Sequence, residues 1–237
     1  MIKCTVCLAE NDEFATTCTS CKAFLQDRIP NLDLFDTGWT VLESPRKAFR
    51  RITLAEHKNY VFFLFTLFGI SLSFTAFWIL RLGNRFTSLM DLIPAAVGSG
   101  IILGGVLAGA MTMIYYGFAR IAGGGTGFKT SYGLLGYSFT PVALSLFLVL
   151  PIELLTFGMY MFTWNPDPYS MKPLSYVILL ALDVILAGWT VWLAIVATRV
   201  GHQLNLWKST MVVLGTLALV AGGAVLLFAP FYSPGLS

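Results

Sequence analysis

Hydrophobic residues form five long, nearly uninterrupted runs along the chain, and polar or glycine- and proline-rich segments separate them. A membrane-spanning helix needs about 20 consecutive apolar residues to cross the hydrocarbon core. The five runs that qualify are Tyr60–Leu80, Leu92–Phe118, Pro141–Phe162, Leu174–Thr198 and Thr210–Tyr232. Lipid offers backbone N–H and C=O groups no hydrogen-bond partners, and the runs lack the period-two alternation of barrel strands. The pattern therefore predicts an all-α integral membrane protein with a five-transmembrane-helix bundle over residues 59–232.

Composition supports this class of protein and excludes two others. The chain is 57% hydrophobic and 11% charged, whereas a soluble domain carries about 25% charge. Such a chain has too little polar surface to cover a soluble globule. A formal net charge of +3, spread along the chain, also gives no footprint for nucleic acid.

The distribution of Lys and Arg predicts the orientation. With the N-terminus in the cytosol, 12 of these residues fall on the cytosolic side and 3 on the outer side, as the positive-inside rule favours. The first 25 residues are polar and have no apolar stretch of the kind found in a cleaved signal. We therefore expect the first run to act as an uncleaved signal and the C-terminus to lie outside.

All four cysteines lie in residues 1–25, as two C-x-x-C hooks: Cys4 with Cys7, and Cys18 with Cys21. Two such hooks can complete a tetrahedral Cys₄ site, and a cytosolic location disfavours disulfides. The spacing predicts a small zinc-ribbon-like knuckle, with an iron centre or a redox pair as alternatives. Four thiolates leave no open position on the metal, so the zinc is expected to be structural.

Residues 26–58 are predicted to hold a linker and a basic amphipathic helix, with the polar linker covering residues 22–44. Ser44 and Pro45 suit an N-cap and a first helical position. The helix that follows has an apolar stripe at Phe49 and Ile52 and the basic residues Arg46, Lys47, Arg50 and Arg51. These bind anionic lipid headgroups or a docking partner, or they only set the topology.

Two carboxylates lie inside predicted spans. Glu153 is expected about 12 Å and Asp183 about 14 Å from the outer face, at 1.5 Å per helical residue. Paired acids at one depth could share a proton, bind a cation or hold a polar lipid headgroup. The alternative is a pair that only fixes helix packing.

Small residues and histidines mark other features. Gly100, Gly104 and Ala108 at four-residue spacing indicate close helix packing, within the bundle or at a dimer face, so the oligomeric state stays open. The segment Gly123–Thr130 lacks the spacing of a phosphate loop. It is expected to turn the chain at the inner surface, where the short apolar piece 133–140 could re-enter. His57 and His202 are expected to be interfacial polar residues.

The stretch from Ser44 to Ser209 resembles the Yip1 family of five-span membrane proteins in its bacterial form. The resemblance begins at Ser44-Pro45-Arg46 and Phe49. It continues in Gly124, Gly125, Phe128, Gly136, Tyr137, Pro141, His202, Trp207 and Lys208. It implies a multi-pass protein of the bacterial cytoplasmic (inner) membrane, with membrane lipids and a membrane protein such as an export ABC transporter as partners.

Two functions remain from these observations. No catalytic constellation is present, so the chain is expected to be a non-enzymatic scaffold or accessory partner for membrane trafficking or an export transporter. The alternative is transport or handling of a small molecule, ion or lipid by Glu153 and Asp183. A cavity that reaches both acids would favour transport or lipid handling, and a dry, close-packed bundle would favour a scaffold.

Overall fold

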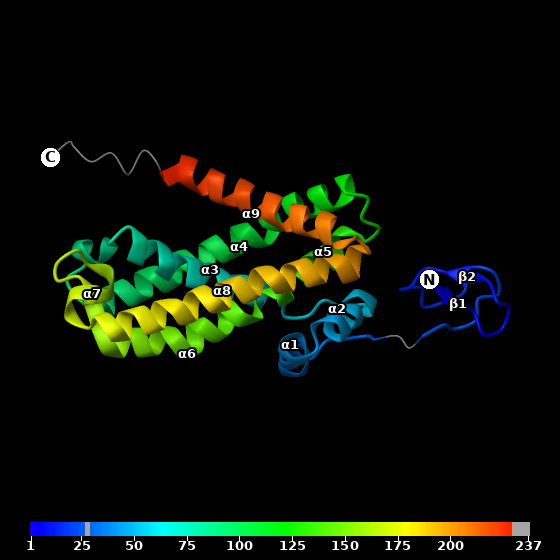
Figure 1. The fold of residues 1–237 in the computed structure, drawn as a ribbon, viewed down its shortest axis with the longest axis horizontal. Helices are drawn as coiled ribbons and strands as arrows, with labels where there is room; N and C mark the ends of the chain where they lie inside the picture. The colour runs from blue at the N-terminus through cyan, green and yellow to red at the C-terminus, as the bar shows by residue number, and fades with distance from the viewer. Residues whose placement is uncertain (27–28, 229–237) are drawn as a thin grey trace.

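Five helical segments of the described residues are long and apolar enough to span a membrane, which confirms the predicted five-helix fold. The structure is a computed structural model that describes residues 1–26 and 29–228. The segments run along one long axis (Figure 1). They are α3 (Val61–Ile79), α4 (Leu89–Ile121), α5–α6–η2 (Phe128–Ser138, Thr140–Phe157 and Gly158–Phe162), α8 (Pro173–His202) and α9 (Leu206–Phe228). The predicted end of the last span, Tyr232, lies outside the described residues.

Short elements complete the architecture. The 3-10 turn η1 (Leu82–Arg85) and the short helix α7 (Pro168–Met171) lie in the connections at one end of the bundle. At the opposite end lie α1 (Leu34–Glu43) and α2 (Pro45–Leu54) (Figure 1). Beyond them is the knuckle, with strands β1 (Ile2–Lys3) and β2 (Glu10–Asn11) paired antiparallel. We call this end the knuckle side.

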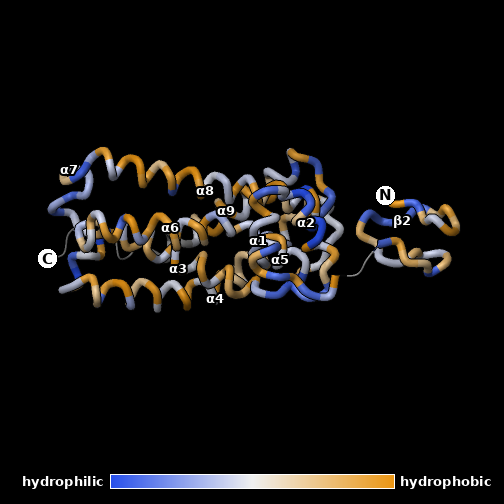
Figure 2. The backbone as a smooth tube through the Cα atoms, turned by 90° about the horizontal axis from the view of Figure 1, so that it is seen from below, coloured by the Kyte–Doolittle hydropathy of each residue, from blue (hydrophilic) through white to orange (hydrophobic). Residues whose placement is uncertain are grey.

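The helices differ in length, and the loops on the knuckle side are shorter than predicted. Helices α3 and α6 have 19 and 18 residues, or about 28 and 27 Å at 1.5 Å per residue, close to the hydrocarbon thickness. Helices α4 and α8 have 33 and 30 residues. Their ends continue past the first residues of α3 and α6, so the segments predicted as long connectors are largely helical. Figure 2 shows the long helices as mostly orange and white, with blue gathered around α2 and, at the opposite end, near α7.

The piece predicted to re-enter the membrane is instead part of a buried helix. Of the predicted piece 133–140, residues 133–138 form the second half of α5, which packs against α4 and α8. This helix packs against protein rather than lipid because glycines, on α5 itself and on α8, allow close approach of the neighbouring side chains. A Cβ on Gly136 would collide with Val61, and one on Gly201 would collide with Leu134.

Helices α3 and α4 pack most closely, through glycine. A Cβ added to Gly104 would lie 2.5 Å from the carbonyl oxygen of Phe65 and 2.7 Å from Cα of Thr66. One added to Gly100 or Gly69 would collide with the backbone of the facing helix. The four-residue spacing therefore serves packing within the bundle, one of the two predicted alternatives.

The predicted linker contains a helix, so that prediction was wrong over Leu34–Glu43. Asp33 caps α1 by accepting a hydrogen bond from the backbone N–H of Asp36 at 2.8 Å. One side of the helix buries Thr37 and Val41. Sequence patterning missed it because ten residues with an aspartate, a glutamate and a glycine resemble a polar loop.

Helix α2 begins at Pro45 as predicted, and Ser44 is its N-cap residue, although the Ser44 side chain makes no capping hydrogen bond. Phe49 and Ile52 are fully buried against the protein core rather than lying on lipid. At the C-terminal end of α2, Lys58 Nζ donates hydrogen bonds to the carbonyl oxygens of Ala55, at 2.5 Å, and of Ile52. Burial, aided by the nearby charge of Lys129, lowers the pKa of Lys58 to about 8.

Candidate functional site

A pocket of about 320 Å³ lies inside the bundle, between α3 and α8, with α6 as its floor. Helices α3 and α8 both pack on α6. Most of the wall is apolar and comes from Phe68, Leu72, Phe74, Leu146, Leu150 and Leu186. Thr75 and Val184 also line the pocket and are exposed on the outer face of the bundle. The pocket is therefore open sideways, toward the region that hydrocarbon would fill.

The two intramembrane acids meet in this pocket. Glu153 of α6 is 5% exposed, and Asp183 of α8 is half-buried. Both line the cavity, and their carboxyl groups interact with each other. Asp183 also accepts a hydrogen bond from the hydroxyl of Ser145. The structure thus brings together the two residues that helix rise placed at one depth.

The pocket also holds a polar group that has no hydrogen-bond partner in the described part of the chain. The indole Nε1 of Trp78 is buried and makes no hydrogen bond among the described residues. A buried N–H without an acceptor costs about 1–3 kcal/mol. An oxygen on a bound molecule would satisfy this donor.

The chemistry of the pocket follows from these groups. Two neighbouring carboxylates in an apolar site are unstable as a pair of free negative charges, so they favour a shared proton or a bound cation. The surrounding wall favours hydrocarbon. The site therefore suits an amphipathic molecule whose polar part donates hydrogen bonds or carries positive charge.

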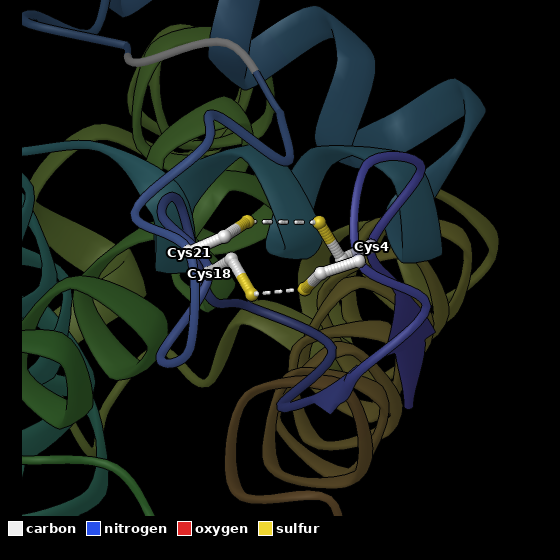
Figure 3. Close-up of side chains that lie close together, drawn as sticks. Cys4, Cys18 and Cys21 are labelled. Carbon is white, nitrogen blue, oxygen red and sulfur yellow. Dashed lines mark hydrogen bonds between the residues drawn. The ribbon is translucent and has the colours of Figure 1, made fainter.

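The four cysteines also meet, at the tip of the chain. Their sulfur atoms all lie within 4.8 Å of one another. Cys4 Sγ lies 3.6 Å from Cys21 Sγ, and Cys7 Sγ lies 3.5 Å from Cys18 Sγ. Figure 3 shows one hook facing the other across these two pairs. A zinc ion with Zn–S bonds of about 2.3 Å needs sulfurs about 3.8 Å apart, so the four residues fit a zinc ion.

Neighbouring N–H groups favour the thiolate form of Cys4 and Cys18. The backbone N–H of Val6 donates to Cys4 Sγ at 3.4 Å, and the Asn11 side-chain amide donates to Cys18 Sγ at 3.5 Å. Hydrogen bonds from the backbone N–H groups of Cys21 and Ser20 lower the pKa of the Cys18 thiol to about 6. Such bonds to the ligand atoms are typical of the surroundings of a bound metal.

The two hooks share a left-handed backbone conformation that is unfavourable for the residues that occupy it. In each hook the residue after the second cysteine, Leu8 or Lys22, has φ of +61°. Its N–H donates to the carbonyl oxygen of the first cysteine, at 3.0 Å from Leu8 and 3.1 Å from Lys22. A left-handed conformation costs a residue with a Cβ about 1–2 kcal/mol.

Replacing Leu8 or Lys22 with glycine is therefore expected to stabilise the metal-bound knuckle. Glycine relieves the strain but loses more backbone entropy on folding. The net gain in stability of the metal-bound form is about 0.5–1 kcal/mol per site, which corresponds to about two- to fivefold in zinc affinity. Competition with a zinc chelator measures this. Ser20→Gly, inside a hook at negative φ, is the matched control and should weaken binding. Equal effects at positions 20 and 22 would contradict the explanation.

Two of the four basic residues of α2 form ion pairs within the protein. Arg50 Nη1 lies 3.4 Å from Glu13 Oε1 of the knuckle, and Arg51 pairs with Asp36 of α1. Arg46 and Lys47 are exposed. The apolar face by which α2 would lie on a bilayer is buried in protein, so only the charges remain for headgroups or a partner, and that role stays a prediction.

His202 is buried in protein at the end of α8 rather than exposed, and its depth at the membrane interface stays a prediction. It is 1% exposed at the end of α8. Its Nδ1 lies 2.8 Å from the Thr126 hydroxyl and its Nε2 lies 3.0 Å from the Ser131 hydroxyl. A Cβ on Gly124 would lie 2.6 Å from Nδ1 of this ring. The histidine thus fastens α8 to the glycine-rich turn and to the start of α5.

The other residues of the resemblance serve mainly as helix contacts. The Tyr137 hydroxyl donates to the carbonyl oxygen of Asn59 at 2.9 Å, and Lys208 Nζ donates to that of Ala122 at 2.9 Å. Pro141 is buried at the start of α6. The side chains of Phe128 and Trp207 are exposed, and a Cβ on Gly125 would meet no atom within 4 Å.

Four residues that contribute to these sites and contacts were missed from sequence. Trp78 gave no signal, because one tryptophan near the end of an apolar run is ordinary in membrane helices. Gly69 is the only glycine inside its run, so no repeated spacing pointed to it. Thr126 and Ser131 lie in a turn whose partner, His202, is more than 70 residues away in the sequence.

Comparisons with known proteins give one match. The chain matches the Yip1 domain over residues 39–228, which takes in part of α1 and everything from α2 to α9. No curated protein matches, and no solved structure matches. Because the match covers most of the chain and agrees with the five-span bundle, this multi-pass membrane protein belongs to the Yip1 domain family.

Proposed function

We propose that the protein is a non-enzymatic membrane protein that takes an amphipathic molecule from the bilayer into the pocket between α3 and α8. The single observation that supports this function most is that one sideways-open cavity reaches both Glu153 and Asp183. A dry, close-packed interior would have favoured a pure scaffold.

The size and walls of the pocket suit part of a lipid. Ligand pockets commonly have about 300–1,000 Å³, and this one has about 320 Å³. It can hold a polar group with a short length of chain while the rest of the molecule stays in the bilayer. Glu153 and Asp183 would accept hydrogen bonds from an ammonium or hydroxyl group, and Trp78 Nε1 would donate to an oxygen.

A docking role for the knuckle is the second candidate function. The knuckle meets the rest of the chain through polar contacts of exposed side chains, such as Arg50 with Glu13 and Gln203 with Asp12. Such contacts add little stability, so a partner can replace them. Zinc in the knuckle, a membrane protein partner such as an export ABC transporter, the bacterial inner membrane and a cytosolic N-terminus all stay predictions.

A double-mutant cycle on the acids tests the proposed function. Glu153→Gln and Asp183→Asn are each expected to lower the amount of co-purifying lipid or other amphipathic molecule by about tenfold, equivalent to 1.4 kcal/mol. The double variant should lose little more, because residues that bind as a pair are not additive. Mass spectrometry of the extracted ligand, relative to protein, gives the readout.

Asp91→Asn is the matched control. This carboxylate lies in the first turn of α4, accepts hydrogen bonds from Thr87 and Ser88 at 2.8 Å, and does not line the pocket. Ligand recovery should not change. Additive losses for the two pocket acids would contradict the pairing, and unchanged recovery in the double variant would contradict the function.

A further inference from the structure

Helix α1 exposes two large aromatic side chains that no part of the described chain covers. Phe35 is 84% exposed and Trp39 is 70% exposed. They are four residues apart, so they lie one above the other on one face of the helix. A soluble surface rarely presents two such residues together, and such a patch indicates a partner or a membrane.

The helix has three distinct sides. At about 100° per residue, Thr37 and Val41 form the buried side, which faces the protein. Phe35 and Trp39 lie on average roughly 160° around from that side, by the same rotation per residue. Asp36 and Glu43 lie further round still and are exposed. Protein, an apolar patch and a polar side follow one another around the helix, as in a helix that lies in a membrane interface.

The depth of α1 matches the boundary of the hydrocarbon on this flank of the bundle. A Cβ placed on Gly38 would lie 3.8 Å from Cγ2 of Thr140, the first residue of α6. The Asn59 side-chain amide, two residues before α3, donates to Asn31 Oδ1 at 3.2 Å just before α1. Since α3 and α6 have the length of the hydrocarbon core, α1 lies beside the point where that core begins. Figure 1 shows α1 at the ends of these helices, viewed nearly along its axis.

The charges around α1 suit lipid headgroups. Asp33 accepts the capping hydrogen bond of its own helix, and Asp36 is paired with Arg51. Arg46 and Lys47 follow on α2 and are exposed. Asp33 and Asp36 are therefore engaged, whereas Glu43 stays exposed. Among the described residues no ion pair holds Arg46 or Lys47, so these two cations can meet lipid phosphates.

We propose that α1 is an interfacial helix that inserts Phe35 and Trp39 into the headgroup–acyl boundary of the leaflet on the knuckle side. Its occupant is the lipid bilayer, not a protein. The helix anchors the segment that carries α2 and the knuckle against the membrane. This inference stands apart from the pocket, because neither aromatic residue lines it.

Photocrosslinking tests the proposal in full-length protein reconstituted in bilayers of phosphatidylethanolamine and phosphatidylglycerol. Benzoylphenylalanine is placed at position 35 or 39. Position 147 is the lipid-facing control, because Phe147 is 60% exposed on α6. Position 24 is the water-facing control, because Phe24 is 74% exposed on the knuckle. All four exchange one exposed aromatic residue for another, so none removes a core contact.

Positions 35 and 39 should form phospholipid adducts at a yield within about twofold of position 147, and position 24 should form few. Adducts at 35 and 39 no more frequent than at 24 would overturn the proposal, as would crosslinks there to protein alone. A second measurement needs no unnatural residue. Lipids brominated near the top of the acyl chains should quench tryptophan emission less in Trp39→Phe than in wild type, and an equal quenched fraction would overturn it.

Discussion

Exchange of Cys18 for serine is expected to remove zinc from the protein and to unfold residues 1–25. A structural zinc ion contributes about 10–16 kcal/mol to the folding of a small peptide domain. A segment of this size has too small a core to fold without it. Its two short strands and turns depend on the hooks, as in the hydrogen bond from the Cys18 N–H to the Ala23 carbonyl oxygen at 2.8 Å.

Metal analysis measures this directly. Wild-type protein purified under reducing conditions should hold one zinc per chain, and Cys18→Ser should hold less than a tenth of that. Hydrogen exchange over residues 1–25 should become fast in the variant and stay slow in Thr5→Ser, an exposed hook residue that is no ligand. Iron in place of zinc, or oxidised thiols without metal, would disprove the zinc site.

Replacing Gly104 with leucine is expected to destabilise the bundle by about 3 kcal/mol or more. Overpacking a close-packed core costs typically about 1–3 kcal/mol. Here the first side-chain atom already meets the backbone of α3 at Phe65 and Thr66. Backbone cannot rotate aside as a flexible side chain can, so α3 and α4 must separate.

Gly109→Leu is the matched control on the same helix. A Cβ there meets no atom within 4 Å, so leucine should be neutral. Unfolding in mixed micelles of increasing denaturing detergent gives both stabilities. Equal stability of the two variants would show that α3 and α4 do not meet through Gly104.

Much of the fold could be predicted because lipid imposes simple requirements. Apolar runs of sufficient length must be helical, and five runs gave five spans. The ends of α4 and α8 could not be predicted, because polar residues such as Arg120 and Arg199 interrupt the apolar pattern without interrupting the helix. Their backbone hydrogen bonds continue regardless of what surrounds the side chains.

The candidate sites were also predictable only in part. The local spacing of the cysteines was enough to predict that they meet. The rise per helical residue was enough to predict that Glu153 and Asp183 lie at one depth. The cavity itself depends on how α3 and α8 pack against α6, and no local sequence pattern predicts that packing. The burial of His202 depends on a turn elsewhere in the chain, and α1 is too short to show a clear period.

Native mass spectrometry of protein released from bilayer nanodiscs tests the central claim most directly. Wild type should retain one bound amphipathic molecule. Ala187→Phe, which fills the pocket from α8, should lose it, whereas Ala181→Phe, an exposed residue of the same helix outside the pocket, should keep it. Equal occupancy in all three proteins, or no bound molecule in wild type, would contradict the account.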